Sequence, residues 1–240
     1  MGESGNSGEE IFLPGGSRQF KQLRDRFDFR GKRAAIFGPA TGAAERFVKR
    51  GVAEATVFVE TNEELVESRL ALADVARAEV RLASFTATAI DDGAFDVAYA
   101  QASIGDDRRE DILKEIRRLL AEDGVLSVGD VVALRDDSPP FVSDLWKRAG
   151  LRPLPHNGFV TFFTDRGFEK IEADFSGDGL ANYYRRSRTK LAEFKETVEP
   201  AEAKLLKKVF ARAKREADAF LDHGGDKFAT FALGVFKKSS

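Results

Sequence analysis

The sequence predicts an α/β fold: a doubly wound, mostly parallel sheet of seven strands, with the last strand antiparallel, flanked by helices and completed by a helical cover. One observation behind this is that short apolar runs alternate with amphipathic stretches between residues 33 and 130. Another is the segment 34–42, AAIFGPATG, in which a continuous apolar run ends in a glycine-bracketed turn that leads into a helix. Backbone N–H groups at such a helix start point outward, and glycine lets a ligand approach them. We therefore expect this turn to be the floor of a binding site.

The strands are expected where apolar runs end at turn residues or charged residues. Asp91-Asp92-Gly93 and Asp123-Gly124 supply such turns before two of them. The expected strands are 33–38, 55–60, 79–84, 95–101, 125–130, 167–175 and 227–237. The last is expected to return as a hairpin onto the sixth, which makes it the antiparallel member of the sheet.

The helices are expected where apolar residues recur at helical spacing between capping residues. Asn62 precedes Glu63 and Glu64, a favourable helix start, and Gly51 occupies a C-terminal cap position. The expected helices are one within 11–29, then 43–50, 62–77, 107–121, one through 146–149, 159–164, 179–197 and 199–222. Strand and helix alternate as right-handed crossovers of a parallel sheet require.

The composition suits one large soluble domain. A chain of 240 residues with 42% hydrophobic residues can bury a full core, and a net charge of −2 gives no general attraction to nucleic acid or acidic membranes. The absence of Cys excludes disulfides and thiolate sites, and the two His, His156 and His223, lie far apart, so we expect no metal. No apolar run reaches the length of a membrane span, and the expected location is the cytoplasm.

Four segments in order carry a resemblance to a known family. They are the turn FGPATG at 37–42, Glu60 at the end of ATVFVE, the run AFDVAYAQ at 94–101, and DILKEIRRLLAEDGVLSVGD at 111–130. Over residues 30–238 this succession resembles a class I S-adenosylmethionine-dependent methyltransferase. The resemblance implies S-adenosylmethionine as cofactor and a small molecule as substrate, methylated at O, N or C.

The resemblance also implies roles for particular residues. The glycine turn would hold the methionine end of the cofactor, Glu60 would grip both ribose hydroxyls with its two acceptor oxygens, and Ser84 with Phe85 would meet the adenine. The end of the fourth strand, at Gln101, would face the transferable methyl. The implied cofactor-binding residues are Gly38, Pro39, Ala40, Thr41, Gly42, Glu60, Thr61, Ser84, Phe85 and Gln101.

The expected domain organisation follows from the same resemblance. Residues 1–10, MGESGNSGEE, are predicted to be a disordered tail, and 11–240 a single domain. Within it we expect an N-terminal helix or lid at 11–29, a cofactor-binding core at 30–135, and substrate-side helices with a terminal hairpin at 136–240. A homodimer is left open.

Three positions depart from the family pattern. Ile36 stands where the family commonly has an acid, Ala40 replaces the middle glycine of the turn, and Ser84 stands where an acid commonly meets the adenine. These departures motivate a second hypothesis, a non-catalytic binding or scaffold protein on the same fold. RNA methylation is a third hypothesis, motivated by the basic run 185–190, although the acids interleaved in the late helices favour a solvated helix face.

Two features of the sequence also resemble other enzyme families. A nicotinamide dehydrogenase with a similar glycine turn would need a Tyr-x-x-x-Lys pair, which the three Tyr do not provide. The segment 138–141, SPPF, resembles a loop of amino-methyltransferases but follows the fifth strand rather than the fourth, so we interpret it as a proline turn ahead of a helix.

Methyl transfer is an in-line displacement, so the protein chiefly aligns donor and acceptor. A general base is needed only when the acceptor must lose a proton. The candidates on the substrate side are His156, in a Pro-rich loop, and the pair Tyr183 and Tyr184, at the start of a late helix.

Overall fold

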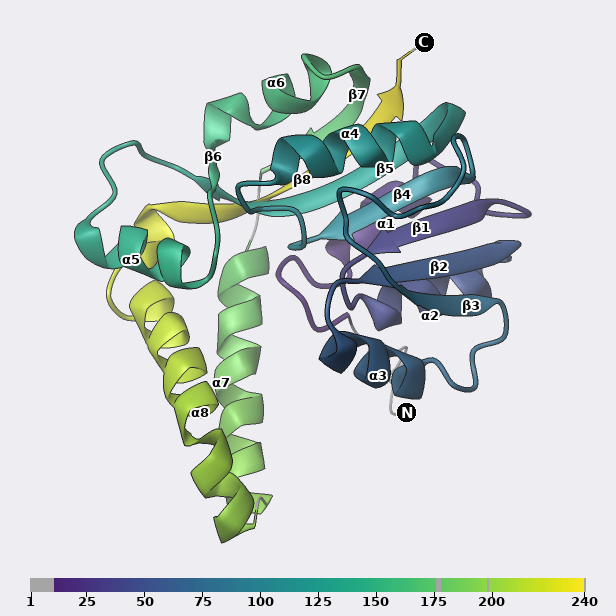
Figure 1. The fold of residues 1–240 in the computed structure, drawn as a ribbon. Helices are drawn as coiled ribbons and strands as arrows, with labels where there is room; N and C mark the ends of the chain where they lie inside the picture. The colour runs from purple at the N-terminus through teal and green to yellow at the C-terminus, as the bar shows by residue number, and fades with distance from the viewer. Residues whose placement is uncertain (1–10, 176–177, 198, 240) are drawn as a thin grey trace, which may run out of the picture.

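The structure, a computed structural model, describes residues 11–175, 178–197 and 199–239, so the tail expected at residues 1–10 lies outside the described residues. Its centre is an eight-stranded sheet in the order β3-β2-β1-β4-β5-β8-β7, with the short β6 beside β5 (Figure 1). The strands are β1 Arg33–Phe37, β2 Glu54–Val59, β3 Ala78–Leu82, β4 Phe95–Gln101, β5 Leu120–Ala133, β6 Leu154–Pro155, β7 Phe168–Asp174 and β8 Ala229–Lys238.

The predicted mixed sheet is confirmed. Strands β1 to β5 pair in parallel, and β8 pairs antiparallel with both β5 and β7. The seven expected strands are all present, and β6 is an addition that is too short to show a periodic pattern. Strand β5 begins at Leu120, earlier than predicted, so the expected Asp123-Gly124 turn lies within the strand, where Asp123 has a positive φ of 64°.

Helices cover both faces of the sheet. The helices are α1 Arg18–Arg24, α2 Thr41–Lys49, α3 Asn62–Ala71, α4 Arg109–Leu119, α5 Pro140–Arg148, α6 Phe159–Thr164, α7 Gly179–Thr197 and α8 Pro200–Leu221, with short 3-10 turns at His156–Gly158 and Gly225–Lys227. Helix α3 is shorter than the predicted 62–77, because the chain turns after Ala71 and reaches a positive φ of 68° at Arg77.

The two faces of the sheet hold separate apolar clusters, as a strand buried on both sides requires. Ala35 and Phe37 of β1 pack with residues of α4 and α6 on one face, whereas Ala34 and Ile36 pack with residues of α1 and α2 on the other. Ile36 is fully buried among apolar side chains. An acid at this position would be desolvated there, which explains the departure noted in the sequence.

The helices expected to cover the site lie in different places. Helices α7 and α8 lie side by side and project away from the sheet as an arm (Figure 1). Helix α1 packs on a face of the sheet, where its residues Phe20 and Leu23 are buried; the lid expected within 11–29 stays a prediction. The part of the N-terminal segment that crosses the edge of the sheet is residues 11–16, which we call the strap.

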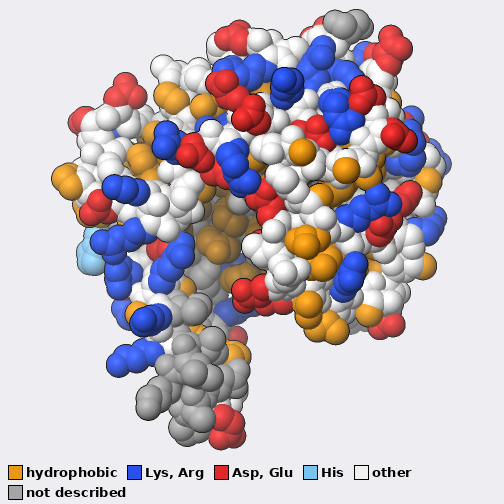
Figure 2. Space-filling view, viewed as in Figure 1, with side chains coloured by type: hydrophobic (Ala, Val, Ile, Leu, Met, Phe, Trp, Pro, Cys, Tyr) orange, Lys and Arg blue, Asp and Glu red, His pale blue; other side chains and the backbone are white. Residues whose placement is uncertain are grey.

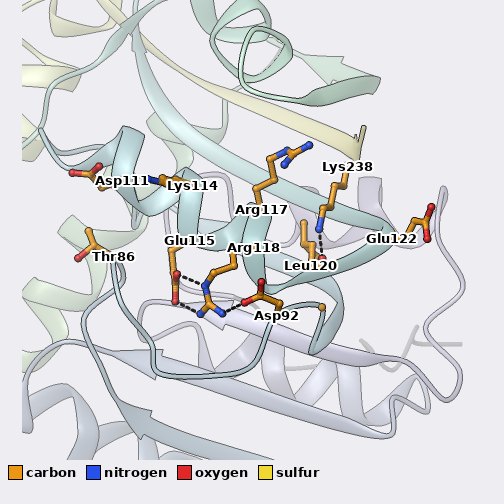
Figure 3. Close-up of a pocket in the computed structure, with 11 residues that line it drawn as sticks. Thr86, Asp92, Asp111, Lys114, Glu115, Arg117, Arg118, Leu120, Glu122 and Lys238 are labelled. Carbon is orange, nitrogen blue, oxygen red and sulfur yellow. Dashed lines mark hydrogen bonds and ion pairs between the residues drawn. The ribbon is translucent and has the colours of Figure 1, made fainter. Parts of the chain in front are cut away.

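A buried carboxylate ties α4 to the loop after β3. Glu115 accepts hydrogen bonds from the backbone N–H (2.8 Å) and the hydroxyl (2.7 Å) of Thr88, and its two oxygens pair with Arg118 at 2.7 and 2.8 Å (Figure 3). The Arg118 guanidinium, assisted by the Thr88 donors, lowers the pKa of Glu115 to about 2. The carboxylate therefore stabilises the fold in its ionised form.

We expect Glu115→Gln to destabilise the protein by about 2 kcal/mol at pH 7. This value is lower than the full pKa shift of Glu115 implies, because solvent around the partly exposed Arg118 screens the ion pair. Because the folded-state pKa is depressed, this stabilisation is present above pH 4.5 or so and is lost as the pH falls toward 2. Urea unfolding at pH 7 and pH 3 measures it, and the difference from wild type should shrink at pH 3. The control is Glu122→Gln, which removes an exposed carboxylate near the same helix and should leave the free energy of unfolding nearly unchanged at either pH. An equal loss of stability in both variants would contradict the stabilising role of Glu115.

Candidate functional site

The glycine turn lies where β1 ends and α2 begins. Gly38 has a φ of +91°, donates its N–H to the Phe58 carbonyl at 2.9 Å, and approaches β4 so closely that a Cβ would lie 2.8 Å from the Cβ of Ser103. Both the backbone conformation and the space therefore require glycine. Strands β1 and β4 are neighbours whose crossovers leave in opposite directions, which is the switch point where open α/β sheets bind ligands.

The rest of the turn shows why the family's middle glycine is absent. Ala40 is 2% exposed, and its methyl belongs to the apolar cluster under α2. Pro39 is exposed, while Thr41 and Gly42 are partly exposed at the start of α2. The turn therefore keeps an accessible helix start, with a core residue in its middle.

Glu60 follows β2 at the same edge of the sheet and is held by three donors. Arg108 donates from its two terminal nitrogens to the two carboxylate oxygens at 2.8 Å each, and the backbone N–H of Phe85 donates to Oε1 at 3.0 Å. Asp106 accepts from the same Arg108 at 2.6 Å. The hydrogen bonds from Arg108 lower the pKa of Glu60. The carboxylate is therefore ionised at neutral pH, but an arginine occupies both of its oxygens.

The other residues expected near the cofactor have structural partners. The hydroxyl of Thr61 caps α3 by accepting from the N–H of Glu64 at 3.1 Å. Ser84 is exposed and shares a hydrogen bond with the Thr86 hydroxyl at 2.9 Å. The ring of Phe85 is buried against Phe37, with centroids 5.5 Å apart. Phe85 therefore contacts the ligand-binding edge of the sheet through its backbone N–H, which donates to Glu60, and not through its ring.

Gln101 ends β4, but its side chain is turned to the strap. Its amide nitrogen donates to the carbonyls of Pro14 (2.8 Å) and Gly16 (2.9 Å). The side chain is 2% exposed.

Residues that the sequence analysis did not select lie at the ends of β4 and β5. Asp130 is 4% exposed; it accepts from the Val131 N–H at 2.8 Å, and Arg109 approaches it at 3.4 Å. Burial raises the pKa of Asp130 to about 6, although Arg109 opposes the shift. The Ser103 hydroxyl is buried, with no hydrogen-bond partner among the described residues. The one sequence signal for Asp130 is a charge at the end of an apolar strand.

The structure brings Tyr183 and Tyr184 together, with ring centroids 5.3 Å apart, but not His156 with them. His156 lies after β6 with its ring 4.5 Å from that of Phe175. The ring of Tyr184 packs on Phe220 at 4.9 Å, and Tyr183 lies 5.6 Å from the ring of Phe12 in the strap. Burial raises the pKa of both tyrosines, so each keeps its proton at neutral pH. They are suited to packing and to donating hydrogen bonds, not to acting as a base.

Among the hollows on the surface, one lies beside the arm and another beside α4. Figure 2 shows one between the arm and the body of the sheet, with hydrophobic side chains inside it. The other, about 860 Å³, runs along α4 (Figure 3). It is lined by Thr86, Asp92, Gly93, Asp111, Lys114, Glu115, Arg117, Arg118, Leu120, Glu122 and Lys238. It contains Glu115 and Arg118, whose charges are already paired, and none of the residues of the glycine turn.

Two searches of the described ranges were negative. Within them, no cluster of three or more His, Cys, Asp or Glu residues could hold a metal ion. No helix in the same part of the chain combines the length and apolar character needed to cross a membrane.

Comparisons with known proteins agree with this architecture. Residues 37–128 match the profile of a family described as a methyltransferase domain. The search of curated proteins found no match.

Solved structures share the fold over nearly the whole chain. A proposed sarcosine dimethylglycine methyltransferase from Galdieria sulphuraria aligns at a TM-score of 0.77 and 16% identity, covering 93% of this chain and 84% of that one. A phosphoethanolamine N-methyltransferase from Haemonchus contortus, solved with S-adenosyl-L-methionine, aligns at 0.78 and 14%, covering 95% of this chain and 54% of that one. The [4+2]-cyclase SpnF aligns at 0.71 and 17%, covering 93% and 80%. The fold is that of the class I methyltransferases.

Proposed function

We propose that this chain, which carries a methyltransferase domain on the class I fold, is an S-adenosylmethionine-dependent methyltransferase that acts on a small molecule. The observation that carries the proposal is the position of Glu60: an ionised carboxylate follows β2 beside the glycine turn, whose helix start at Thr41 and Gly42 is partly exposed, at the switch point of the sheet. When bound, the cofactor would supply a sulfonium methyl that passes to a nucleophilic O, N or C atom of the acceptor.

The residues present fit this cofactor. Gly38 packs closely on Ser103 in the loop after β4, and the Ser103 hydroxyl has no hydrogen-bond partner among the described residues, so it is free to bond to a ligand. Glu60 offers two acceptor oxygens, which match two ribose hydroxyls. We propose that these groups hold the cofactor, with Gly42 and Thr41 at the helix start near its carboxylate.

The acceptor is proposed to enter from the hollow beside the arm. Its hydrophobic interior would exclude water from the methyl transfer. Its walls would also hold the acceptor in line with the donor. The two methyltransferases compared above are named for small amines, which supports an acceptor of that size.

Arg108 must leave Glu60 for ribose hydroxyls to bind there, and this gives a prediction. We expect Arg108→Gln to tighten binding of S-adenosylhomocysteine about threefold, since a partly exposed ion pair contributes under about 1 kcal/mol. Wild-type affinity should rise modestly with salt, which screens the pair, whereas the variant should lose this dependence. Calorimetry at low and moderate salt measures both. Arg81→Gln, which removes an exposed arginine paired with Glu79, is the control; weaker binding by Arg108→Gln would mean that Arg108 contacts the ligand.

A second candidate function is a protein on this fold that does not methylate. The occupied carboxylate of Glu60 favours it, as does the fold shared with a [4+2]-cyclase. RNA methylation, the cytoplasmic location and a homodimer stay predictions from the sequence. A steep salt dependence of RNA binding is expected if RNA is the substrate, and a flat one would remove that option.

One titration separates the candidates. We expect calorimetry with S-adenosylmethionine and S-adenosylhomocysteine to show binding of each ligand in the micromolar range, at one site per chain. The absence of heat with either ligand at two temperatures, in protein that unfolds cooperatively, would contradict the proposed function and favour the non-methylating candidate.

A further inference from the structure

The strap, residues 11–16, lies wedged between the glycine turn, the sheet and the arm. Ile11 is 2% exposed and touches the turn, because a Cβ on Gly42 would lie 3.5 Å from its side chain. Gly15 packs on the ring of Phe231 in β8, and its Cα lies 3.2 Å from the position of a Cβ on Gly179, the first residue of α7. The strap therefore contacts the glycine turn, β8 and the first residue of α7.

Gln101 fastens the strap to the centre of the sheet. Both hydrogens of its amide are used on strap carbonyls, those of Pro14 and Gly16. Its own oxygen accepts from the Tyr99 hydroxyl at 2.6 Å. Tyr99 is fully buried, and burial raises its pKa far above the usual value, so the hydroxyl keeps its proton and remains a donor. The amide orientation is therefore fixed, with its nitrogen toward the strap.

The other side of the strap reaches the arm. The ring of Phe12 lies 5.6 Å from that of Tyr183 in α7. The Lys190 ammonium lies 4.0 Å from the centre of the Phe12 ring, and the Arg186 guanidinium lies 5.2 Å from it. These two cation–π contacts and the ring contact with Tyr183 join three residues of α7 to one strap side chain. The strap thus links the turn on one side with α7 on the other.

We propose that Gln101 is a positioning residue that locks the strap across the cofactor turn and, through Phe12, holds α7 in place beside the acceptor hollow. The ligand leaves or enters at the turn when the strap leaves Gln101. The family resemblance implies that Gln101, at the end of β4, faces the transferable methyl. In the structure its amide instead donates hydrogen bonds to the strap. The part of the inference that concerns ligand exchange rests on the proposed function, whereas the lock on the strap does not.

The test joins hydrogen exchange of the strap with the dissociation rate of S-adenosylhomocysteine. In the strap, the Gly16 N–H bonds to the Leu13 carbonyl at 2.9 Å and reports on its order. Gln101→Leu keeps the volume and removes both donors, so we expect Gly16 exchange and ligand dissociation each to accelerate about tenfold. The control is Gln22→Leu, a buried glutamine of α1 without hydrogen bonds among the described residues, which should match wild type in both.

Each outcome decides the proposal. Unchanged exchange at Gly16 in folded Gln101→Leu would overturn the lock, and faster exchange with an unchanged dissociation rate would overturn its role in ligand exchange. If Gln101→Leu does not fold, Tyr99→Phe replaces it: loss of the orienting hydroxyl should accelerate Gly16 exchange by a few fold, and no acceleration would overturn the lock. If wild type binds no S-adenosylhomocysteine, the proposed function fails. Hydrogen exchange at Gly16 then tests on its own whether Gln101 holds the strap in place.

Discussion

Replacing Glu60 by Ala is expected to weaken binding of S-adenosylhomocysteine about 100-fold. Two hydrogen bonds from ribose hydroxyls to a carboxylate contribute about 1.5–3 kcal/mol each. Against this, the wild type must first release Arg108, whose partly exposed ion pair with Glu60 is worth under about 1 kcal/mol. With both bonds at the lower end of that range, about 3 kcal/mol together, and a few tenths of a kcal/mol lost in releasing Arg108, about 2.7 kcal/mol remains, which corresponds to the expected factor.

The matched control is Glu63→Ala. Glu63 lies in the first turn of α3, is exposed, and carries the same charge close to the site without a contact at the sheet edge. It should bind within about twofold of wild type, because a solvated charge at this distance is screened. Equal losses in the two variants would mean that net charge, not the ribose contact, governs affinity. No loss in Glu60→Ala would contradict the proposed role of Glu60.

Replacing Gly38 by Ala is expected to destabilise the protein by about 3 kcal/mol. A side chain at a φ of +91° is strained by about 1–2 kcal/mol, and overpacking adds about 1–3 kcal/mol. The new methyl would lie 2.8 Å from the Cβ of Ser103, an atom close to the backbone of the loop after β4 that cannot rotate away. Urea unfolding measures the loss, and the displaced turn should also weaken binding of S-adenosylhomocysteine.

Gly31→Ala separates the two causes. Gly31 also has a positive φ, +68°, but a Cβ there would meet nothing within 4 Å. This variant should therefore show only the backbone strain, about 1–2 kcal/mol, with unchanged ligand binding. If Gly38→Ala were no more destabilised than Gly31→Ala, the close approach of β1 and β4 would not limit the residue at the turn.

The sheet could be predicted because its signals are local. Strands β1, β2 and β4 are mostly apolar, whereas the edge strand β3 also carries Glu79 and Arg81. Their parallel order follows from the alternation with helices. Glu60 could be placed at the ligand-binding edge for the same reason, since the carboxyl ends of β1 and β2 must meet there. The helix lengths could not be predicted as well: Leu72 and Val75 still pack against the apolar core, yet α3 ends at Ala71 because the chain turns there.

The partners of the site residues could not be predicted, because they depend on contacts between distant parts of the chain. Arg108 reaches Glu60 across 48 residues, and nothing in the run DDRRE distinguishes it from a solvated arginine. Gln101 reaches the strap across 87 residues. Ile36 and Ala40 read as departures from a motif, whereas the structure places both in the apolar cluster under α1 and α2.

The central claim is that Glu60 exchanges Arg108 for the cofactor ribose. A crystal structure of the protein with saturating S-adenosylhomocysteine tests it most directly. The account predicts both ribose hydroxyls within hydrogen-bond distance of the Glu60 carboxylate, Arg108 retained by Asp106 alone, and the methionine end at the glycine turn. A structure in which Arg108 still pairs with both Glu60 oxygens while the ligand lies elsewhere, or is absent at saturating concentration, would contradict it.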